Sequence, residues 1–150
     1  MTAHHIAQLN IGHAIAPMDD PLMADFVAWL DEINGLGERS PGFVWRLKGE
    51  GGTSVELQVD DDDPLYVVNL TVWRSMEDLH AFTYRSEHKA VFKRRFDWFE
   101  RRGTPNVCLW WVPIGTIPTL EDAERRLGLL TDHGPTSEAF TFKQPFPAPE

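Results

Sequence analysis

The sequence contains a single cysteine and few basic residues for its length. Lysine and arginine total 14 against 23 aspartates and glutamates, so the formal net charge at pH 7 is −9. One cysteine excludes a disulfide within the chain and is typical of a reducing compartment. Cys108 lies in an apolar run, so we expect it to be buried. The acidic balance argues against a protein that coats nucleic-acid phosphates.

Long hydrophobic runs are also missing. No uninterrupted apolar stretch reaches the roughly 20 residues that span a bilayer, and the N-terminus has no basic segment followed by an apolar run. We therefore predict a cytoplasmic protein with no membrane and no nucleic-acid partner. The 150 residues, of which 42% are hydrophobic, are enough for one domain with a substantial core, so we predict a single domain over residues 1–150.

Familiar cofactor and metal motifs are absent. The chain has no glycine-rich phosphate loop, no dinucleotide fingerprint, no His-Glu-x-x-His motif and no serine elbow. Four aspartates follow one another at 60–63, but neighbouring carboxylates on an extended chain point in different directions and rarely converge on one ion. We therefore expect no metal and no cofactor.

What is present is hydrophobic periodicity that alternates between strand and helix patterns. We expect strands at His5–Ile11, Phe43–Lys48, Tyr66–Trp73 and Val107–Val112, with a possible short strand at Ser54–Val59. In the second of these, Phe43, Trp45 and Leu47 are expected on one face and Val44, Arg46 and Lys48 on the other. Helices are expected from Asp20 to the Gly35–Gly37 region, from Ser75, from Ser86 to Gly103, and over 119–134. The tail at 135–150 is hydrophobic enough to dock on the body or on a partner subunit.

The order of these elements predicts the fold class. Strand, helix, strand, strand, helix pair and strand is the split β-α-β pattern of the α+β ferredoxin-like fold, an antiparallel sheet with helices on one face. The other face of such a sheet is bare, and the chain is too aromatic for that face to meet water. We therefore expect a homodimer in which two sheets pack face to face, which is a dimeric α/β barrel.

Seven parts of the chain together carry a family resemblance. They are Tyr66–Trp73, Ser75–Leu79, His88, Arg94–Glu100, Leu109–Pro113, Pro118 with Glu121–Leu127, and Ala139–Phe142. This combination resembles the domain-of-unknown-function 3291 family, which is similar to the dimeric α/β-barrel superfamily of antibiotic-biosynthesis and haem-degrading monooxygenases. The resemblance implies a pocket between the sheet and the helices of each subunit. It implies no particular reaction, because one fold hosts many chemistries.

A haem site is not expected from this resemblance. Asn10, Trp73 and a helix histidine are superficially similar to the residue set of the haem-degrading relatives. The sequence spacing from Trp73 to His88 is longer than the tryptophan–histidine spacing of those relatives, and a helix break lies between the two residues. His80 is nearer, but it falls on the side of its helix opposite the main apolar positions.

The candidate catalytic pair is His88 and Arg95. The imidazole of His88 titrates near neutral pH and can act as a base. Arg95, seven residues further along the chain, can stabilise the enolate that such a base would form. The candidate substrate-binding residues are hydrogen-bond donors on the sheet and aromatic walls: Asn10, Asn69, Trp73, Tyr84 and Trp98.

Three hypotheses for function fit these residues. The first is cofactor-independent monooxygenation of an enolisable or phenolic, hydrophobic or aromatic small molecule of the natural-product kind. The second is a non-oxidative cyclase, dehydratase or isomerase acting on a similar substrate, which would not require oxygen. The third is a non-catalytic dimer that binds a hydrophobic ligand. The residues alone leave all three open.

Overall fold

The computed structural model describes residues 3–47, 65–85, 88–101 and 103–149. For five of these residues only the backbone is described: Asp31, Arg85, His88, Val91 and Phe92. The short strand expected at 54–59, the aspartates at 60–63 and the helix start expected at Ser86 lie outside the described residues.

The described elements alternate between strands and helices as the periodicity indicated. In chain order they are β1 (His4–His13), η1 (Pro21–Met23), α1 (Ala24–Arg39), β2 (Phe43–Arg46), β3 (Tyr66–Trp73), α2 (Met76–Arg85), α3 (His88–Lys93), α4 (Arg95–Trp98), β4 (Val107–Pro113) and α5 (Leu120–His133). In the described part of the chain, no helix combines the length and the apolar character needed to cross a membrane.

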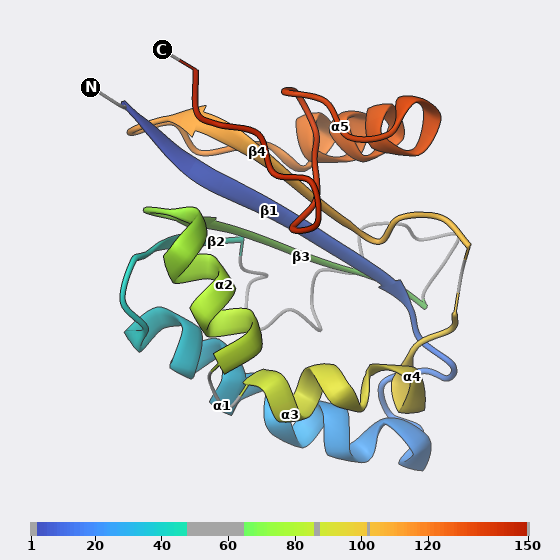
Figure 1. Ribbon diagram of the computed structural model, residues 1–150. Coiled ribbons are helices and arrows are strands. Elements are labelled where there is room, and N and C mark those ends of the chain that lie inside the picture. Colours follow the sequence, from blue (N-terminus) through green and yellow to red (C-terminus); the bar gives the residue numbers. More distant parts are fainter. Residues whose placement is uncertain (1–2, 48–64, 86–87, 102, 150) are drawn as a thin grey trace.

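The four strands form one sheet in the order β2-β3-β1-β4. All three neighbouring pairs are antiparallel. Helices α1 to α4 lie on one side of this sheet and α5 lies on the other (Figure 1). The strand order and the helices together confirm the predicted α+β, ferredoxin-like fold.

Helix starts follow the capping signals in the sequence. Ser75 Oγ accepts a hydrogen bond of 3.1 Å from the backbone N–H of Asp78 and caps α2. Thr119 Oγ1 accepts one of 3.1 Å from Asp122 N–H and caps α5. These bonds satisfy N–H groups that have no partner within the helix.

The end of α1 was predicted too early. The helix continues through Gly35 and Gly37 and ends at Arg39. Gly37 is buried, and a Cβ atom at this position would touch the ring of Phe82 at 3.4 Å. Close packing of α1 against α2 is therefore the role of this glycine. The chain turns instead at Gly42, which has a φ of 84° that favours glycine.

The predicted helix from Ser86 to Gly103 is interrupted. The structure has two short helices there, α3 and α4, with Arg94 between them. The guanidinium of Arg94 lies over the rings of Trp29 and Trp98, at 5.4 and 4.7 Å from their centroids, and holds this corner against α1. Phe99 then leaves the helix in an extended conformation and forms a bridge to Ala14, just beyond β1. Pairing with the end of β1 thus replaces the last helical turns.

The sheet face opposite α1 to α4 is partly covered by the chain itself. Ala123, Leu127 and Leu130 of α5 belong to one buried cluster with Leu9 and Trp110 of the sheet. The expectation that this face is bare within one subunit is therefore wrong on the β1–β4 side. Further out, Phe140 in the tail exchanges two backbone hydrogen bonds of 2.8 and 2.9 Å with Leu109 and extends the sheet beyond β4.

Candidate functional site

Polar side chains occupy the middle of the sheet face that the helices cover. Gln8 on β1 is paired with Thr71 on β3, and Asn10 is paired with Asn69. Residues opposite one another in an antiparallel pair share a face, with Cβ atoms about 5 Å apart. One step further along the same face, Ile6 and Trp73 pack with Leu79 of α2, which shows that this face is turned toward the helices. We call the Gln8–Thr71 and Asn10–Asn69 pairs the polar rows.

A chain of hydrogen bonds joins the first polar row to a buried tryptophan. Trp73 Nε1 donates to Thr71 Oγ1 at 3.1 Å, and Thr71 Oγ1 donates to Gln8 Oε1 at 3.0 Å. Thr71 is only 8% exposed, so these bonds offset the cost of burying its hydroxyl. The ring of Trp73 also stacks on Phe82 at 5.0 Å. Trp73 is therefore a core residue whose polar edge faces the row.

Arg46 on β2 adds a residue from a third strand to the first polar row, which already joins β1 and β3. It is the register partner of Thr71, whereas Phe43 is paired with Trp73 and Trp45 with Val72. The register shifts between Phe43 and Trp45, so Phe43 and Arg46 share the helix-covered face. The predicted alternation, which placed Phe43 with Trp45 and Leu47, is therefore wrong at Phe43. The Arg46 guanidinium is buried, with Nη2 3.7 Å from Glu38 Oε1 on α1.

The second polar row lies near a tight contact between sheet and helix. Gly12 is the next residue of β1 on the same face as Asn10, and a Cβ atom there would come within 2.8 Å of Phe99 Cδ1. Phe99 thus packs against the backbone of β1 at one end of the two polar rows. The cluster of Ile6, Trp73 and Leu79 lies at the other end. Asn10 and Asn69 are themselves half-buried. The structure brings these two predicted residues together.

The predicted catalytic pair is only partly placed. His88 begins α3, but its side chain lies outside the part of the chain that the structure describes. The guanidinium of Arg95 lies over the ring of Phe96, at 4.5 Å from its centroid, on a half-exposed surface.

Two other predicted aromatic residues lie away from the polar rows. Trp98 is buried in a separate cluster with Met23 and Ala14, and its carbonyl accepts a hydrogen bond from Ile15 N–H. Ala14 follows the end of β1, four residues or roughly 13 Å along the chain from Asn10 of the second polar row, so Trp98 packs beyond the end of the strand rather than against the rows. Tyr84 packs beside His80 and Phe142, with ring centroids at 4.7 and 5.5 Å.

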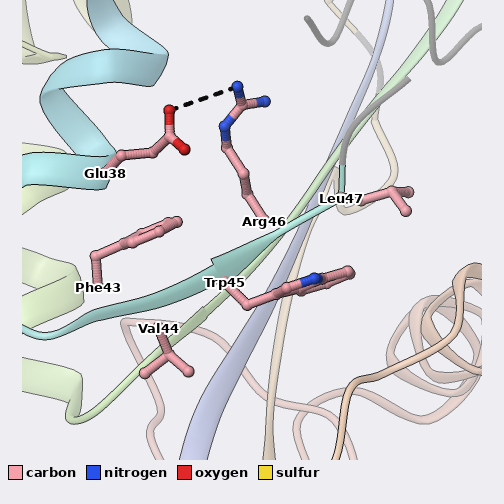
Figure 2. Close-up of a pocket in the computed structure, with 6 residues that line it drawn as sticks. All are labelled: Glu38, Phe43, Val44, Trp45, Arg46 and Leu47. Carbon is pink, nitrogen blue, oxygen red and sulfur yellow. Dashed lines mark ion pairs between the residues drawn. The ribbon is translucent and has the colours of Figure 1, made fainter. Parts of the chain in front are cut away.

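Two open pockets lie at the margins of the sheet. One, of about 450 Å³, is at β2, and the other, of about 250 Å³, lies between α2 and the tail. The described residues that line the first are Glu38, Phe43, Val44, Trp45, Arg46 and Leu47 (Figure 2). Those that line the second are Met76, Glu77, His80 and Phe142. Asn10 and Asn69 are among neither set, but Arg46 connects the first pocket to the polar rows.

Metal and thiol chemistry find little support in the described residues. Across residues 3–47, 65–85, 88–101 and 103–149, no cluster of three or more histidine, cysteine, aspartate or glutamate side chains could hold a metal ion. Burial raises the pKa of the Cys108 thiol to about 12, which keeps it protonated at neutral pH. Cys108 is thus a packing residue, as its apolar surroundings in the sequence indicated.

The comparisons with known proteins place the chain in a family. Residues 5–150 match the family described as a domain of unknown function, DUF3291. The chain belongs to this family. A comparison with curated proteins gives no match.

Solved structures share its fold at low sequence identity. A protein of unknown function from Nitrosomonas europaea, NE2512, has a TM-score of 0.51 at 13% identity and covers 79% of this chain and 99% of its own. PA3566 from Pseudomonas aeruginosa gives the same score and identity over 77% of this chain and 99% of its own. A Nitrosomonas europaea protein provisionally named an antibiotic biosynthesis monooxygenase has a TM-score of 0.45 at 16% identity. The match covers 78% of this chain and 93% of that protein.

Sequence reasoning missed three residues of this site: Gln8, Thr71 and Arg46. A signal for the first two is present in the sequence, because each alternates with apolar residues on its strand and shares its predicted face with Asn10 or Asn69. No such signal exists for Arg46, because the register shift in β2 decides which face it occupies.

Proposed function

We propose that this family member binds a small phenolic or enolic molecule between its sheet and helices and oxidises it with molecular oxygen, without a cofactor. The observation that carries the proposal is the pair of polar rows on a face that helices cover. An inward face of a ferredoxin-like sheet needs only apolar side chains to pack against helices. Two half-buried asparagines side by side are donors and acceptors suited to a polar ligand.

The chemistry divides into a proton transfer and an oxidation. A base removes a proton from the substrate, and amide N–H groups of Asn10 and Asn69 stabilise the resulting enolate or phenolate. His88, at the start of α3, is the proposed base. The carbanion form then reacts with oxygen, and a methylene becomes a carbonyl: R–CH₂–R′ + O₂ → R–CO–R′ + H₂O. One oxygen atom enters the product and the other leaves as water, so the substrate itself supplies the electrons.

A second copy of the chain is the proposed cover for the rest of the outer sheet face. On the β2–β3 side of this face, Trp45, Leu47 and Tyr66 are only partly buried, and Val44 is 40% exposed. Apolar surface of this kind is typical of subunit interfaces. We expect sedimentation equilibrium to give twice the 17.1 kDa chain mass. A monomer at micromolar concentration would contradict this part of the proposal.

Oxygen dependence is the test of the reaction. Purified protein is screened against phenolic and enolic compounds under air and under argon, and products formed under ¹⁸O₂ are analysed by mass spectrometry. The proposal expects turnover under air alone and one ¹⁸O atom in the product. Turnover under argon would instead support a cyclase, dehydratase or isomerase. Binding without turnover in either gas would support a ligand-binding dimer.

Matched asparagine variants test the site. Asn10→Ala and Asn69→Ala each remove an amide from the second polar row, and each is expected to lower kcat/KM about tenfold or more. Asn106→Ala is the control, because Asn106 is exposed in the segment before β4. The proposed site is wrong if the control and the two row variants have equal activity.

A further inference from the structure

The hydrogen-bond chain that starts at Trp73 has a fixed direction. An indole N–H can only donate, so Thr71 Oγ1 is the acceptor of the 3.1 Å bond from Trp73 Nε1. The threonine hydroxyl keeps one proton of its own, which it donates to Gln8 Oε1 at 3.0 Å. Trp73 and Thr71 are 1% and 8% exposed, so water hardly competes for either bond. The chain therefore ends on the carbonyl oxygen of the Gln8 amide.

This direction decides which end of the Gln8 amide is left for a ligand. If the amide were turned around, its NH₂ group would face Thr71 Oγ1, and the buried hydroxyl proton would lose its acceptor. With Oε1 bound to Thr71, the Nε2 group points away from the hydroxyl. Among the residues that the structure describes, none accepts a hydrogen bond from Nε2, and Gln8 is half-buried. Gln8 therefore offers N–H donors to a molecule that lies beside it.

Gln8 is a neighbour of the second polar row on the same face. Asn10 is two residues further along β1, and Asn69 is diagonally opposite Gln8 on β3, because the direct partner of Gln8 is Thr71. Diagonal neighbours of this kind are about 7–8 Å apart, which long side chains can bridge. One oxygen atom of a ligand on this patch of sheet can therefore accept from Gln8 and from an asparagine amide at the same time.

We infer that Gln8 Nε2 donates to the enolate or phenolate oxygen of the substrate, and that Thr71 and Trp73 are positioning residues that aim this donor. The inference rests on the proposed binding site between sheet and helices, and it adds a preference for the ionised form of the ligand. An ionised oxygen only accepts, which matches the Gln8 N–H groups, whereas a neutral phenol also has a proton that needs an acceptor. A donor that is already oriented needs no reorganisation when the negative charge forms.

The probes for this preference are 4-nitrophenol and 4-nitrotoluene. Ionised and neutral 4-nitrophenol absorb at different wavelengths, so absorbance at one fixed pH gives the ionised fraction of the bound probe. 4-Nitrotoluene has the same ring and no ionisable group. Under argon, the wild type is expected to bind ionised 4-nitrophenol about tenfold more tightly than 4-nitrotoluene, and to raise its ionised fraction above that of the free probe. Equal affinities, or no binding of 4-nitrophenol up to about 10 mM, would overturn the inference.

Gln8→Glu changes the donor and little else. The new side chain keeps the shape and the acceptor for Thr71, but it replaces the NH₂ group with an oxygen. It should lower the affinity for ionised 4-nitrophenol about tenfold or more and leave that for 4-nitrotoluene unchanged. Gln144→Glu adds the same charge at an exposed glutamine of the tail and should change neither affinity. Equal losses in the two variants would overturn the inference, because they would show a general effect of charge.

The positioning role has its own pair of variants. Thr71→Val removes the hydroxyl that aims Gln8, and Thr71→Ser keeps it. Thr71→Val should weaken the binding of ionised 4-nitrophenol several-fold without weakening that of 4-nitrotoluene, and Thr71→Ser should restore it. A hydroxyl that only stabilises the fold would affect both probes alike. Arg46, the register partner of Thr71 on β2, also favours an anion on this face, but it is the same in every variant.

A measurement on the wild type does not depend on the folding of any variant. In ¹H–¹⁵N NMR spectra, the side-chain NH₂ signals of Gln8 should shift on addition of 4-nitrophenol and stay in place on addition of 4-nitrotoluene. The absence of a shift with 4-nitrophenol would overturn the inference.

Asn10→Ala separates the failure of this inference from the failure of the proposed site. Loss of affinity for ionised 4-nitrophenol in Asn10→Ala but not in Gln8→Glu would keep the site and overturn the role of Gln8. Unchanged affinity in both variants would overturn the site together with the inference. Loss in both variants would support the inference, whether or not the protein oxidises a substrate in air.

Discussion

Thr71 Oγ1 accepts a hydrogen bond from Trp73 Nε1 at 3.1 Å on the helix-covered face of β3. The two residues are two positions apart on one strand, so their side chains lie on the same face. The tryptophan ring is 1% exposed, and its N–H has no access to water. The threonine hydroxyl thus accepts from a buried donor and itself donates a hydrogen bond to Gln8 Oε1.

Thr71→Val is expected to destabilise the fold by about 1–3 kcal/mol, because it leaves the Trp73 donor buried and unpaired while keeping the side-chain shape. Urea unfolding followed by tryptophan fluorescence measures the change. Thr116→Val, at an exposed threonine after β4, is the control and should change the free energy of unfolding by no more than about 0.5 kcal/mol. Equal effects of the two variants would show that the hydrogen bond does not stabilise the protein.

Gly12→Ala is expected to destabilise the protein by about 1–3 kcal/mol through overpacking. The new methyl group would lie 2.8 Å from Phe99 Cδ1, so the ring or the backbone of β1 must move. Gly128→Ala is the matched control: a Cβ atom there meets no other atom within 4 Å on α5. That variant should stabilise the protein by about 0.5–1 kcal/mol, because alanine favours a helix over glycine. Thermal unfolding should give a lower Tm than the wild type for Gly12→Ala and a higher Tm for Gly128→Ala.

Local signals in the sequence were sufficient for most of the elements. Ser75 and Thr119 are followed by acidic residues at the third position and begin helices as predicted. Alternation along β1 and β3 placed Asn10 and Asn69 on polar faces, and the structure makes them partners. These signals act within a few residues, so they do not depend on the rest of the fold.

Features that depend on distant partners were not predictable in the same way. The break at Arg94 follows from its contacts with Trp29 and Asp25 on α1, far away in the sequence. The face of Arg46 follows from a register shift against β3. The position of α5 follows from the packing of its apolar residues against Leu9 and Trp110 on the second sheet face. In each of these three cases the local sequence pattern is compatible with more than one arrangement, and contacts with distant residues decide which arrangement forms.

Phe140→Ala tests how firmly the tail is attached to the sheet. The Phe140 side chain is fully buried, in one cluster with Ile6, Trp73 and Leu109, so its truncation should cost about 3–5 kcal/mol. Phe96→Ala is the control, because Phe96 is 36% exposed, and it should cost no more than about 1 kcal/mol. Limited proteolysis should also cut the tail of the Phe140 variant faster than that of the wild type. Similar stabilities of both variants would contradict a docked tail.

Asp122→Asn tests the charged network at the start of α5. Burial alone raises the pKa of Asp122, but hydrogen bonds from Arg126 and Arg125 outweigh it and hold the pKa below its ordinary value of 3.8. A carboxyl group whose pKa is lowered by folding stabilises the protein above the pKa of the unfolded chain, and this contribution is lost as the pH falls through the lower, folded pKa. The wild type should therefore exceed the variant in free energy of unfolding at pH 6, and this difference should narrow toward pH 3.

Urea unfolding at both pH values measures the difference in free energy of unfolding. Adding 1 M NaCl should also reduce it, because the ion pairs of Asp122 are partly exposed to salt. A gap that stays constant with pH would show that Asp122 acts through the shape of its side chain rather than through its charge.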